Sequence, residues 1–415
     1  MVNLVYKDYP YGKAEGFAEY EVRAFDESQM KNIELYSLYE LKKPEMRYVP
    51  KNFGVHQVYA ERKPRWSAKA CLQMLSRDTL KEILFVLKTR PKEGVLRSIY
   101  RIYRYLYAAE AMKANFEYDK SEENVFLCYW LNECAYAALK IKDRHPGVKV
   151  VSRGHGFDIL EERCYMPFRR KILGSLDQIF VISKTAYQYL EERYPWLDMK
   201  KVQVSHLGVN IPKNVCHVSR RKPFHLVTCS SVIPLKRLDL LIDALAGIES
   251  DGIVWTHLGD GPLKKDLCAR ADKEFAGRNI TVNFKGQLRL EDVHRFYETE
   301  EIHLFVNCSD TEGVPVSVME AMSYGIPCIA RNVGGNGELV DNCCGRVISS
   351  EANPEELAEA IRCFMQMSDQ NYETFRTNAR AKIMRQFNSE ITYSEYVEKI
   401  NEMFGRSSTE AENRP

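Results

Sequence analysis

The chain has 415 residues, which is enough for two or three domains with substantial cores. Lysine and arginine number 59 and aspartate and glutamate 57, and this net charge of +2 argues against a nucleic-acid-binding protein that works through overall positive charge. Apolar residues make up 45% and charged residues 28%, a composition that excludes disordered and fibrous classes.

Cysteine usage and hydropathy indicate the compartment. The twelve cysteines contain no C-x2-C pair, and we expect reduced thiols in apolar segments rather than a disulfide scaffold, a redox pair or a metal site. The N-terminus does not resemble a signal peptide, and the longest apolar stretch, 124–141, is interrupted by Asn132 and Glu133. We therefore expect a cytoplasmic protein whose membrane contacts, if any, are peripheral.

The first 120 residues carry the weaker structural signals. Residues 3–8 predict a strand, and the glycine-bearing segment 9–25 predicts a loop that leads into a helix. One or two further strands are expected within 28–60, and leucines recur every three or four residues in 67–90, which predicts a helix.

Residues 94–113 predict an amphipathic helix rich in arginine and tyrosine. Arg97, Arg101 and Arg104 recur at intervals of four and three, beside an apolar stripe. Two interpretations stay open. The helix could lie on an anionic membrane surface, or it could pack within the domain and present a solvated basic face.

From residue 124 onward, strand and helix signals alternate, which predicts parallel sheets covered on both faces. The segment 210–223 contains two prolines and a basic cluster and is interpreted as a linker, after which the alternation starts again. Strands are expected at 124–131, 149–156, 178–183, 201–209, 224–231, 252–261, 279–286, 301–309 and 327–335. Helices are expected at 354–367, 372–391 and 391–404, followed by a polar, disordered tail at 405–415.

Two glutamates eight residues apart carry the strongest chemical signal. Glu312 lies in a strand-to-helix loop, and Glu320 lies on the helix that follows Pro315. Open parallel sheets bind ligands at this edge, where the backbone N–H groups of Val314 to Val318 would cradle an anion. A carboxylate one turn inside the helix could accept hydrogen bonds from vicinal hydroxyls such as those of a ribose. By itself, this spacing also fits a helix cap and a solvated glutamate.

His155 is a second candidate. It lies between two glycines at the end of a predicted strand, where glycines permit close approach of a ligand to the backbone. The alternative interpretation is a histidine with a structural role in a turn.

The segment EGVPVSVMEAMSYGIPCIARNVGG resembles the signature of glycosyltransferase family 4, the large group of retaining enzymes with the GT-B fold. The Gly-Asp-Gly-Pro turn in 257–267 and the segments 201–210, 180–190 and 152–160 match in the expected order. The resemblance covers residues 120–390. The matching positions of the signature are Glu312, Gly313, Pro315, Glu320, Ala321, Met322, Gly325, Pro327, Gly334, Gly335 and Glu338.

The resemblance implies an α/β protein with the GT-B fold, in which two Rossmann-like domains face a central cleft. Residues 1–209 would form the acceptor-binding domain, and residues 224–390 would bind the nucleotide-sugar. The helix at 391–404 would pack back on the first domain.

The resemblance also implies roles for residues on the donor side. Glu320 would bind the ribose, Glu312 would lie at the hexose, and Lys236 would pair with the diphosphate. Many members carry an arginine where this chain has Ser230 and Ser231. Either Arg237 replaces that arginine, or the phosphates have one cation fewer. The expected donor-binding set is Glu320, Arg237, Ser231, Gly313, Val314, Pro315, Val316, Gly259 and Gly286, and the expected catalytic set is Glu312, His155 and Lys236.

On the acceptor side, the resemblance places His155 near the transferred sugar, and Asp158 and Arg153 would shape the site. Gly12, Lys13 and Glu15 stand where family members carry a glycine loop. The basic segment 162–173 and the helix at 94–113 would offer a cationic apolar face to a lipid-linked acceptor. No metal and no cofactor is expected, because no acidic cluster stands at a strand end.

The resemblance therefore predicts a retaining hexosyltransferase of surface polysaccharide biosynthesis. It would be similar to the enzymes that build capsule, O-antigen or exopolysaccharide. The donor would be a UDP- or GDP-linked sugar, and the acceptor a growing glycan or a polyprenyl-linked saccharide. Peripheral contact with an anionic membrane on the inner face of the cell membrane fits this activity. The alternatives are a GT-B sugar-nucleotide epimerase, a phosphorylase, or a non-catalytic protein that binds sugar nucleotides.

Overall fold

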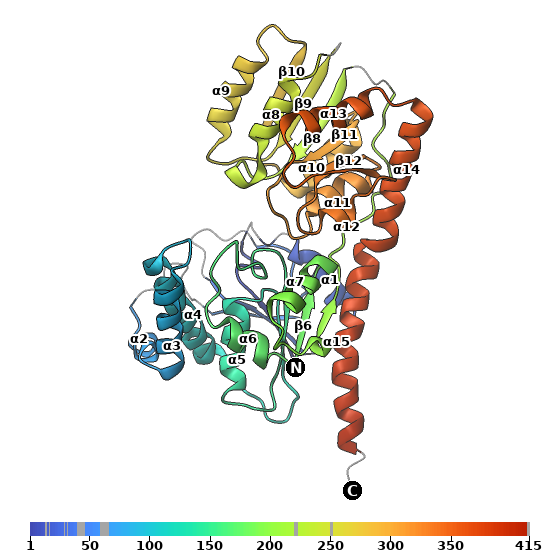
Figure 1. Cartoon of the computed structure of the whole chain (residues 1–415). Helices are drawn as coiled ribbons and strands as arrows, with labels where there is room; N and C mark the ends of the chain where they lie inside the picture. Colours follow the sequence, from blue (N-terminus) through green and yellow to red (C-terminus); the bar gives the residue numbers. More distant parts are fainter. Residues whose placement is uncertain are drawn as a thin grey trace. The chain divides into compact units, whose positions relative to one another are not determined.

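The computed structural model describes residues 1–12, 15, 17–28, 30, 32–39, 46–58, 66–219, 223–249 and 252–412, without the side chains of 404–412. The chain divides into two units (Figure 1). The first unit contains residues 1–205 and 393–415, and the second contains residues 206–392.

The first unit is built on a seven-stranded, entirely parallel sheet with the strand order β3-β2-β1-β4-β5-β6-β7. Apolar side chains fill most of the central strands, as expected for strands covered on both faces. The strands are β1 (Val2–Tyr6), β2 (Ile33–Ser37), β3 (Gly54–Gln57), β4 (Val125–Cys128), β5 (Lys149–Gly154), β6 (Gln178–Val181) and β7 (Val202–Val204).

Eight helices belong to the described part of the first unit, and two of them fall in the segment with the leucine periodicity. Ser67 and Ser76 cap these two helices, and the second cap separates what the sequence predicts as one helix. The helices are α1 (Ala18–Glu27), α2 (Ala68–Met74), α3 (Arg77–Thr89), α4 (Val95–Asn115), α5 (Glu133–Lys142), α6 (Arg169–Ser175), α7 (Lys184–Arg193) and, from Tyr393 onward, α15 (Ser389–Glu412).

The second unit is built on a six-stranded parallel sheet with the order β10-β9-β8-β11-β12-β13. The strands are β8 (Phe224–Cys229), β9 (Ile253–Leu258), β10 (Ile280–Gly286), β11 (Leu304–Asn307), β12 (Cys328–Arg331) and β13 (Gly345–Ile348). The helices are α8 (Leu238–Ala246), α9 (Lys264–Glu274), α10 (Leu290–Thr299), α11 (Val316–Ser323), α12 (Asn336–Leu339), α13 (Pro354–Met365) and α14 (Asp369–Gln386). The predicted fold class of two Rossmann-like α/β domains is therefore confirmed.

Each sheet reverses its strand order once, between β1 and β4 in the first unit and between β8 and β11 in the second. The loops on either side of such a reversal diverge to opposite faces of the sheet and leave a crevice at the carboxyl ends of the strands. These two switch points are where a ligand site is expected in each unit.

Two boundaries and one strand differ from the sequence prediction. Residues 210–219 belong to the second unit, because Cys216 is buried there and its backbone N–H donates to Tyr324 O at 2.9 Å. The short strand β13 was not expected. Helix α15 runs to Glu412, so residues 405–412, predicted to be disordered, are helical. No helix in the described ranges combines the length and the apolar character needed to cross a membrane.

Candidate functional site

In the second unit, a lysine and a glutamate meet across the switch point. Lys236 ends the short 3-10 turn after β8, and Glu312 lies in the loop after β11. The Lys236 Nζ lies 2.6 Å from Glu312 Oε1, and the two side chains are 19% and 10% exposed. The structure thus brings together two residues that are 76 positions apart and that the sequence predicts at one site.

Neighbouring groups fix the Glu312 loop. Asn307, the last residue of β11, donates its side-chain N–H to Glu312 Oε1 at 3.3 Å. Gly334 approaches so closely that a Cβ on it would lie 2.0 Å from Glu312 O, and its φ of +52° favours glycine as well. The backbone N–H of Gly335 donates to Gly313 O at 2.6 Å. The two glycines of the signature therefore allow the β12–α12 loop to support the glutamate.

Helix α11 begins beside this pair, after Pro315. No described side chain caps it, so first-turn N–H groups such as that of Val316 face the loop without an intrahelical partner. The N–H of Val318 is not part of this anion cradle, because it donates to Pro315 O at 3.1 Å. The predicted cradle is therefore shorter at its C-terminal end than the segment 314–318.

Glu320 lies in the middle of α11 and is only 6% exposed. Burial raises the pKa of its carboxyl group to about 8. The carboxyl acts electrostatically on Cys229, at the end of β8, and on Tyr297 of α10. Glu320 is therefore mainly protonated at neutral pH and lies next to the same switch point as the Lys236–Glu312 pair.

Arg237 follows Lys236 in the left-handed conformation, with φ of +47°. Its guanidinium pairs with Asp310 at 3.1 Å and with Asp239 at 3.2 Å. Asp310 also pairs with Arg331, so Arg237 belongs to a four-residue charge cluster. Before it could replace the absent family arginine, it would have to loosen these contacts. Ser231 is exposed in the same loop.

Two glycines complete this edge of the sheet. A Cβ on Gly259 would lie 1.8 Å from Ser230 O, and the residue has a φ of +143°. Its N–H donates to Gly286 O at 2.9 Å, which holds the loops after β9 and β10 together. Both predicted glycines therefore lie at the carboxyl edge of the sheet, with Gly259 next to Ser230.

In the first unit, His155 follows β5 within a cluster of aromatic rings. Its ring stacks on Tyr129 at 4.6 Å and lies 4.5 Å from Trp130, which in turn contacts Phe157 at 4.8 Å. Neither ring nitrogen has a hydrogen-bond partner among the described residues, although Asp158 lies 3.9 Å from Nδ1. Burial lowers the pKa of the imidazole, which favours the neutral form.

Asp158 and Arg153 are buried, and both bind other groups of the protein. Asp158 is fully buried and accepts hydrogen bonds from the N–H groups of Leu131 at 2.9 Å and His155 at 2.6 Å, which joins the loops after β4 and β5. Arg153 is fully buried as well, pairs with Glu21 at 3.0 Å and donates to Ser205. Both can influence an acceptor only by positioning other groups.

The expected glycine loop after β1 has a similar positioning role. Glu15 is 2% exposed and accepts hydrogen bonds from the backbone N–H groups of Lys7, Asp8 and Tyr9 and from the Trp130 indole. A Cβ on Gly12 would lie 2.4 Å from Asp8 Cβ, so the turn requires glycine. Glu15 therefore fixes this loop, and its carboxylate is occupied. Lys13 lies outside the described residues.

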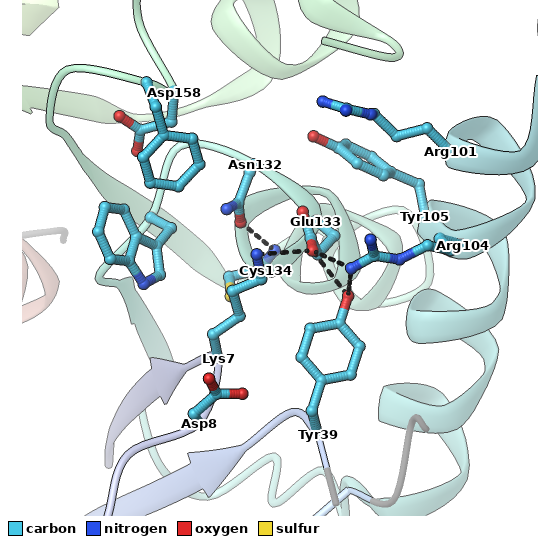
Figure 2. A network of polar contacts seen from close by, with 12 residues as sticks. Lys7, Asp8, Tyr39, Arg101, Arg104, Tyr105, Asn132, Glu133, Cys134 and Asp158 are labelled. Carbon is cyan, nitrogen blue, oxygen red and sulfur yellow. Dashed lines mark hydrogen bonds and ion pairs between the residues drawn. The ribbon is translucent and has the colours of Figure 1, made fainter. Parts of the chain in front are cut away.

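A polar cluster at the switch point of the first unit was not expected from the sequence (Figure 2). Glu133, the first residue of α5, accepts hydrogen bonds from the Tyr39 hydroxyl at 2.7 Å and from Arg104 at 3.0 Å, and Lys7 lies 3.4 Å away. Burial alone would raise the pKa of Glu133, but Lys7 and Arg104 bring it down to about 2. The glutamate is therefore ionised and holds both cations at the edge of the sheet.

Unsatisfied groups in this cluster are mainly donors. Asn132 is 1% exposed and caps α5 through its side-chain oxygen, while its side-chain nitrogen has no partner among the described residues. Arg104 Nε also has no hydrogen-bond partner among the described residues. A ligand rich in acceptor oxygens would satisfy both. The sequence does carry one signal of this cluster, namely that Asn132 and Glu133 interrupt an apolar run directly after a strand.

The cysteines are reduced, and the described acidic residues, cysteines and histidines show no cluster that could hold a metal ion. All twelve cysteines are free thiols. Burial raises the pKa of several of them, including Cys229 and Cys308 to about 12, which favours the unreactive thiol form. Among the described residues, no three His, Cys, Asp or Glu side chains come together in a way that could hold a metal ion. The expectation of a reaction without metal stays a prediction.

The fold and these two switch-point sites define an α/β protein of two Rossmann-like domains. Comparison with known proteins agrees with this class. Residues 217–382, which lie within the second unit, match the family model described as glycosyl transferases group 1. The match covers less than half of the chain.

The chain is also similar to individual glycosyltransferases. It is 25% identical over 213 residues to the amylovoran biosynthesis glycosyltransferase AmsK of Erwinia amylovora, across 49% of this chain and 51% of AmsK. The chain thus spans about half the length of that relative. It matches the lipopolysaccharide outer core galactosyltransferase WaaB at 16% identity, with a TM-score of 0.68 over 98% of this chain and 99% of WaaB. The Anabaena protein HepE, solved in complex with UDP, matches at 15% identity with a TM-score of 0.64 over 97% and 99%. The fold is that of GT-B glycosyltransferase structures.

Proposed function

We propose that the chain is a retaining glycosyltransferase of family 4 that transfers a hexosyl group in surface polysaccharide biosynthesis. The donor is a UDP- or GDP-linked sugar bound by the second unit. The acceptor is a growing glycan or a polyprenyl-linked saccharide bound by the first unit, at the inner face of the cell membrane. The proposed reaction requires no metal.

The observation that carries the proposal is the Lys236–Glu312 pair at the switch point of the second unit, with Nζ and Oε1 2.6 Å apart. A nucleoside diphosphate leaving group needs positive charge at the phosphates, and an ammonium group beside the N-terminus of α11 supplies it. The carboxylate of Glu312 would hold the hexose hydroxyls next to the bond that breaks. Glu320, with Cys229 and Tyr297 as neighbours, would receive the ribose.

The first unit supports an acceptor role through its aromatic rings and donors. Phe157, which is half-buried and packs on the buried Trp130 ring, offers an apolar face on which a sugar ring could pack. Lys7, Arg104 and Asn132 add hydrogen-bond donors at the same edge of the sheet. His155, with no hydrogen-bond partner among the described residues, would complete the contact with the transferred sugar.

Nucleotide binding is the first test. Thermal shift measured with UDP, GDP and ADP should reveal one nucleotide that raises the melting temperature, because a ligand at 100 times its Kd stabilises by about 2.7 kcal/mol. The same nucleotide should have a much smaller effect on Lys236→Ala. If no nucleotide stabilises the wild-type chain, the donor site is refuted.

Transfer and its stereochemistry form the second test. The chain is incubated with a panel of UDP- and GDP-sugars and saccharide acceptors, and the anomeric proton of the product is followed by NMR. The proposal expects an α-linked product from an α-linked donor. A β-linked product would refute retention, and an epimerised sugar nucleotide without any product would identify the chain as an epimerase.

A further inference from the structure

Exposed apolar side chains are concentrated in one short segment of the first unit. Of the 15 large apolar residues that are exposed in the described chain, nine lie between residues 66 and 100. We call these nine residues the leucine face. They are Trp66 (80% exposed), Leu72 (69%), Leu75 (70%), Leu80 (46%), Leu84 (64%), Phe85 (52%), Leu87 (50%), Leu96 (83%) and Tyr100 (46%). An exposed apolar surface of this density marks an interaction site.

The leucine face covers the outer side of α2, α3 and the start of α4. In Figure 1, α2 and α3 lie at the outer edge of the first unit, and both pack on α4. Helix α3 buries Thr79 and Val86 on its inner side. Its leucines at 80, 84 and 87 recur at intervals of four and three, so they form a stripe of their own that points away from that inner side.

Positive charge accompanies the apolar residues. Residues 66–100 contain seven Lys or Arg and three Asp or Glu, a balance of +4, whereas the chain as a whole carries +2. The remaining 380 residues therefore sum to −2. All seven basic residues of this segment are exposed, namely Lys69, Arg77, Lys81, Lys88, Arg90, Lys92 and Arg97.

The acidic residues of the segment are mostly turned away from solvent. Glu93 pairs with Arg101 at 2.9 Å, and Glu82 accepts a hydrogen bond from the Tyr165 hydroxyl. Only Asp78 is exposed, with 62% of its side chain accessible. The surface therefore presents apolar and basic groups together, which is the combination that anionic lipid surfaces bind.

Arg97 is exposed, but several other basic groups that the sequence suggested for a membrane are engaged elsewhere. Arg101 donates to Tyr165 O, and Arg104 binds Glu133 in the polar cluster. In the segment 162–173, Arg169 is buried and Arg170 lies 4.7 Å from the Trp196 ring. The exposed surface is formed instead by the helices that precede and begin α4.

We infer that the leucine face docks on an anionic lipid bilayer, with its leucines in the interface and its lysines at the headgroups. A second copy of the chain fits less well, because a symmetric contact would place seven basic residues against seven others. Docking itself does not depend on the proposed function. The inference rests on the proposed function only where it connects the docked protein with a lipid-linked acceptor.

The experiment measures co-sedimentation of the full chain with phosphatidylcholine vesicles, either pure or with about 30% phosphatidylglycerol. We expect binding to the anionic vesicles that weakens with salt, and much weaker binding to the neutral ones. The triple variant Leu84→Ser, Leu87→Ser, Leu96→Ser should lose at least about tenfold in vesicle affinity, since three exposed apolar groups leave the interface. Lys81→Glu with Lys88→Glu should remove the preference for anionic vesicles.

Leu290→Ser with Met384→Ser is the matched control, because both residues are exposed in the second unit, at 37% and 44%. This variant should bind like wild type. Nucleotide-induced thermal shift should be unchanged in the triple variant, which separates a failure of docking from a failure of the proposed function. Vesicle binding unaffected by the leucine substitutions, no wild-type binding, or a wild-type dimer that the triple variant converts to monomer would each overturn the inference.

Discussion

The two switch points present the same pair of residue types in different settings. In the first unit, Glu133 is held by Lys7, Arg104 and the Tyr39 hydroxyl. In the second unit, Glu312 has Lys236 at 2.6 Å and the Asn307 amide at 3.3 Å.

The number of partners is what distinguishes the two glutamates. A carboxylate with two cations and a hydroxyl is fixed as part of the scaffold, whereas one held by a single lysine and an amide is free to exchange partners with a ligand. The same topology therefore holds one glutamate as part of the scaffold and leaves the other with fewer partners to exchange for a ligand.

Glu312→Gln should have the largest effect. It removes the carboxylate proposed to hold the hexose, so transfer measured as kcat should fall at least about 1000-fold, which corresponds to about 4 kcal/mol. Glu359→Gln, an exposed glutamate of α13, is the control and should stay within a factor of two of wild type. Transfer by Glu312→Gln at the wild-type rate would show that this pair is not the reactive one.

Glu133→Gln should act chiefly on stability. It leaves Lys7 and Arg104 without their common anion, so the free energy of unfolding should fall by about 3 kcal/mol. The folded pKa of about 2 lies below the ordinary value of 4.5, so the contribution of Glu133 is complete above pH 4.5 and disappears as the pH falls towards 2. Urea titrations at pH 7 and pH 3 measure this difference.

Glu19→Gln provides the comparison for that measurement, because its pair with Arg23 is a half-exposed i,i+4 contact. It should lower the free energy of unfolding by about 0.5 kcal/mol or less. Equal losses in the two variants would contradict the distinction between a scaffold pair and a surface pair.

Lys236→Ala should weaken nucleotide binding about 10- to 100-fold, since a charge-assisted contact to phosphate contributes about 1.5–3 kcal/mol. Lys236→Arg should restore part of the affinity. Lys7→Ala, the corresponding change in the first unit, should leave nucleotide affinity unchanged. Isothermal titration with the stabilising nucleotide measures all three, and an equal loss in both alanine variants would remove the distinction between the units.

Glu320→Gln should change how the stability of the chain depends on pH. The folded pKa of about 8 exceeds the ordinary value of 4.5, so between these values the folded chain keeps a proton that the unfolded chain loses. Wild-type stability therefore falls with rising pH through this group, by at most about 1.4 kcal/mol per pH unit. The variant lacks this loss of stability with rising pH. Its free energy of unfolding relative to wild type should therefore rise between pH 5.5 and 7.5, as measured by denaturant titrations.

The sequence predicted most strands of the two sheets. Buried parallel strands such as β4 and β11 appear as apolar runs between turn signals, and the helices between them carry apolar stripes. β13 was missed because a strand of four residues that begins with a glycine, directly after Cys343 and Cys344, carries too little pattern. The outward stripe of α3 shows the limit of periodicity, which identifies a helix but not the side that is covered.

For the site, the sequence located Glu312, Glu320 and Lys236 because they belong to one local signature and one neighbouring turn. It could not locate the Lys7, Arg104 and Glu133 cluster, because those residues come from three distant segments joined only by the fold. The sequence also did not show which of the predicted site residues are buried. The sequence predicts Arg153 and Glu15 on the acceptor side, but in the structure both side chains are buried and bind internal partners.

The protonated state of Glu320 has a consequence for how a charged ligand is received. At neutral pH, Glu320 adds little negative charge to the edge of the second sheet that meets an incoming diphosphate, and Lys236 pairs there with Glu312. Any bound ligand that stabilises the ionised form of Glu320 must expel its proton into solvent. The heat of binding would then vary with the ionisation enthalpy of the buffer, and affinity would increase with pH as the carboxyl group approaches its own titration range.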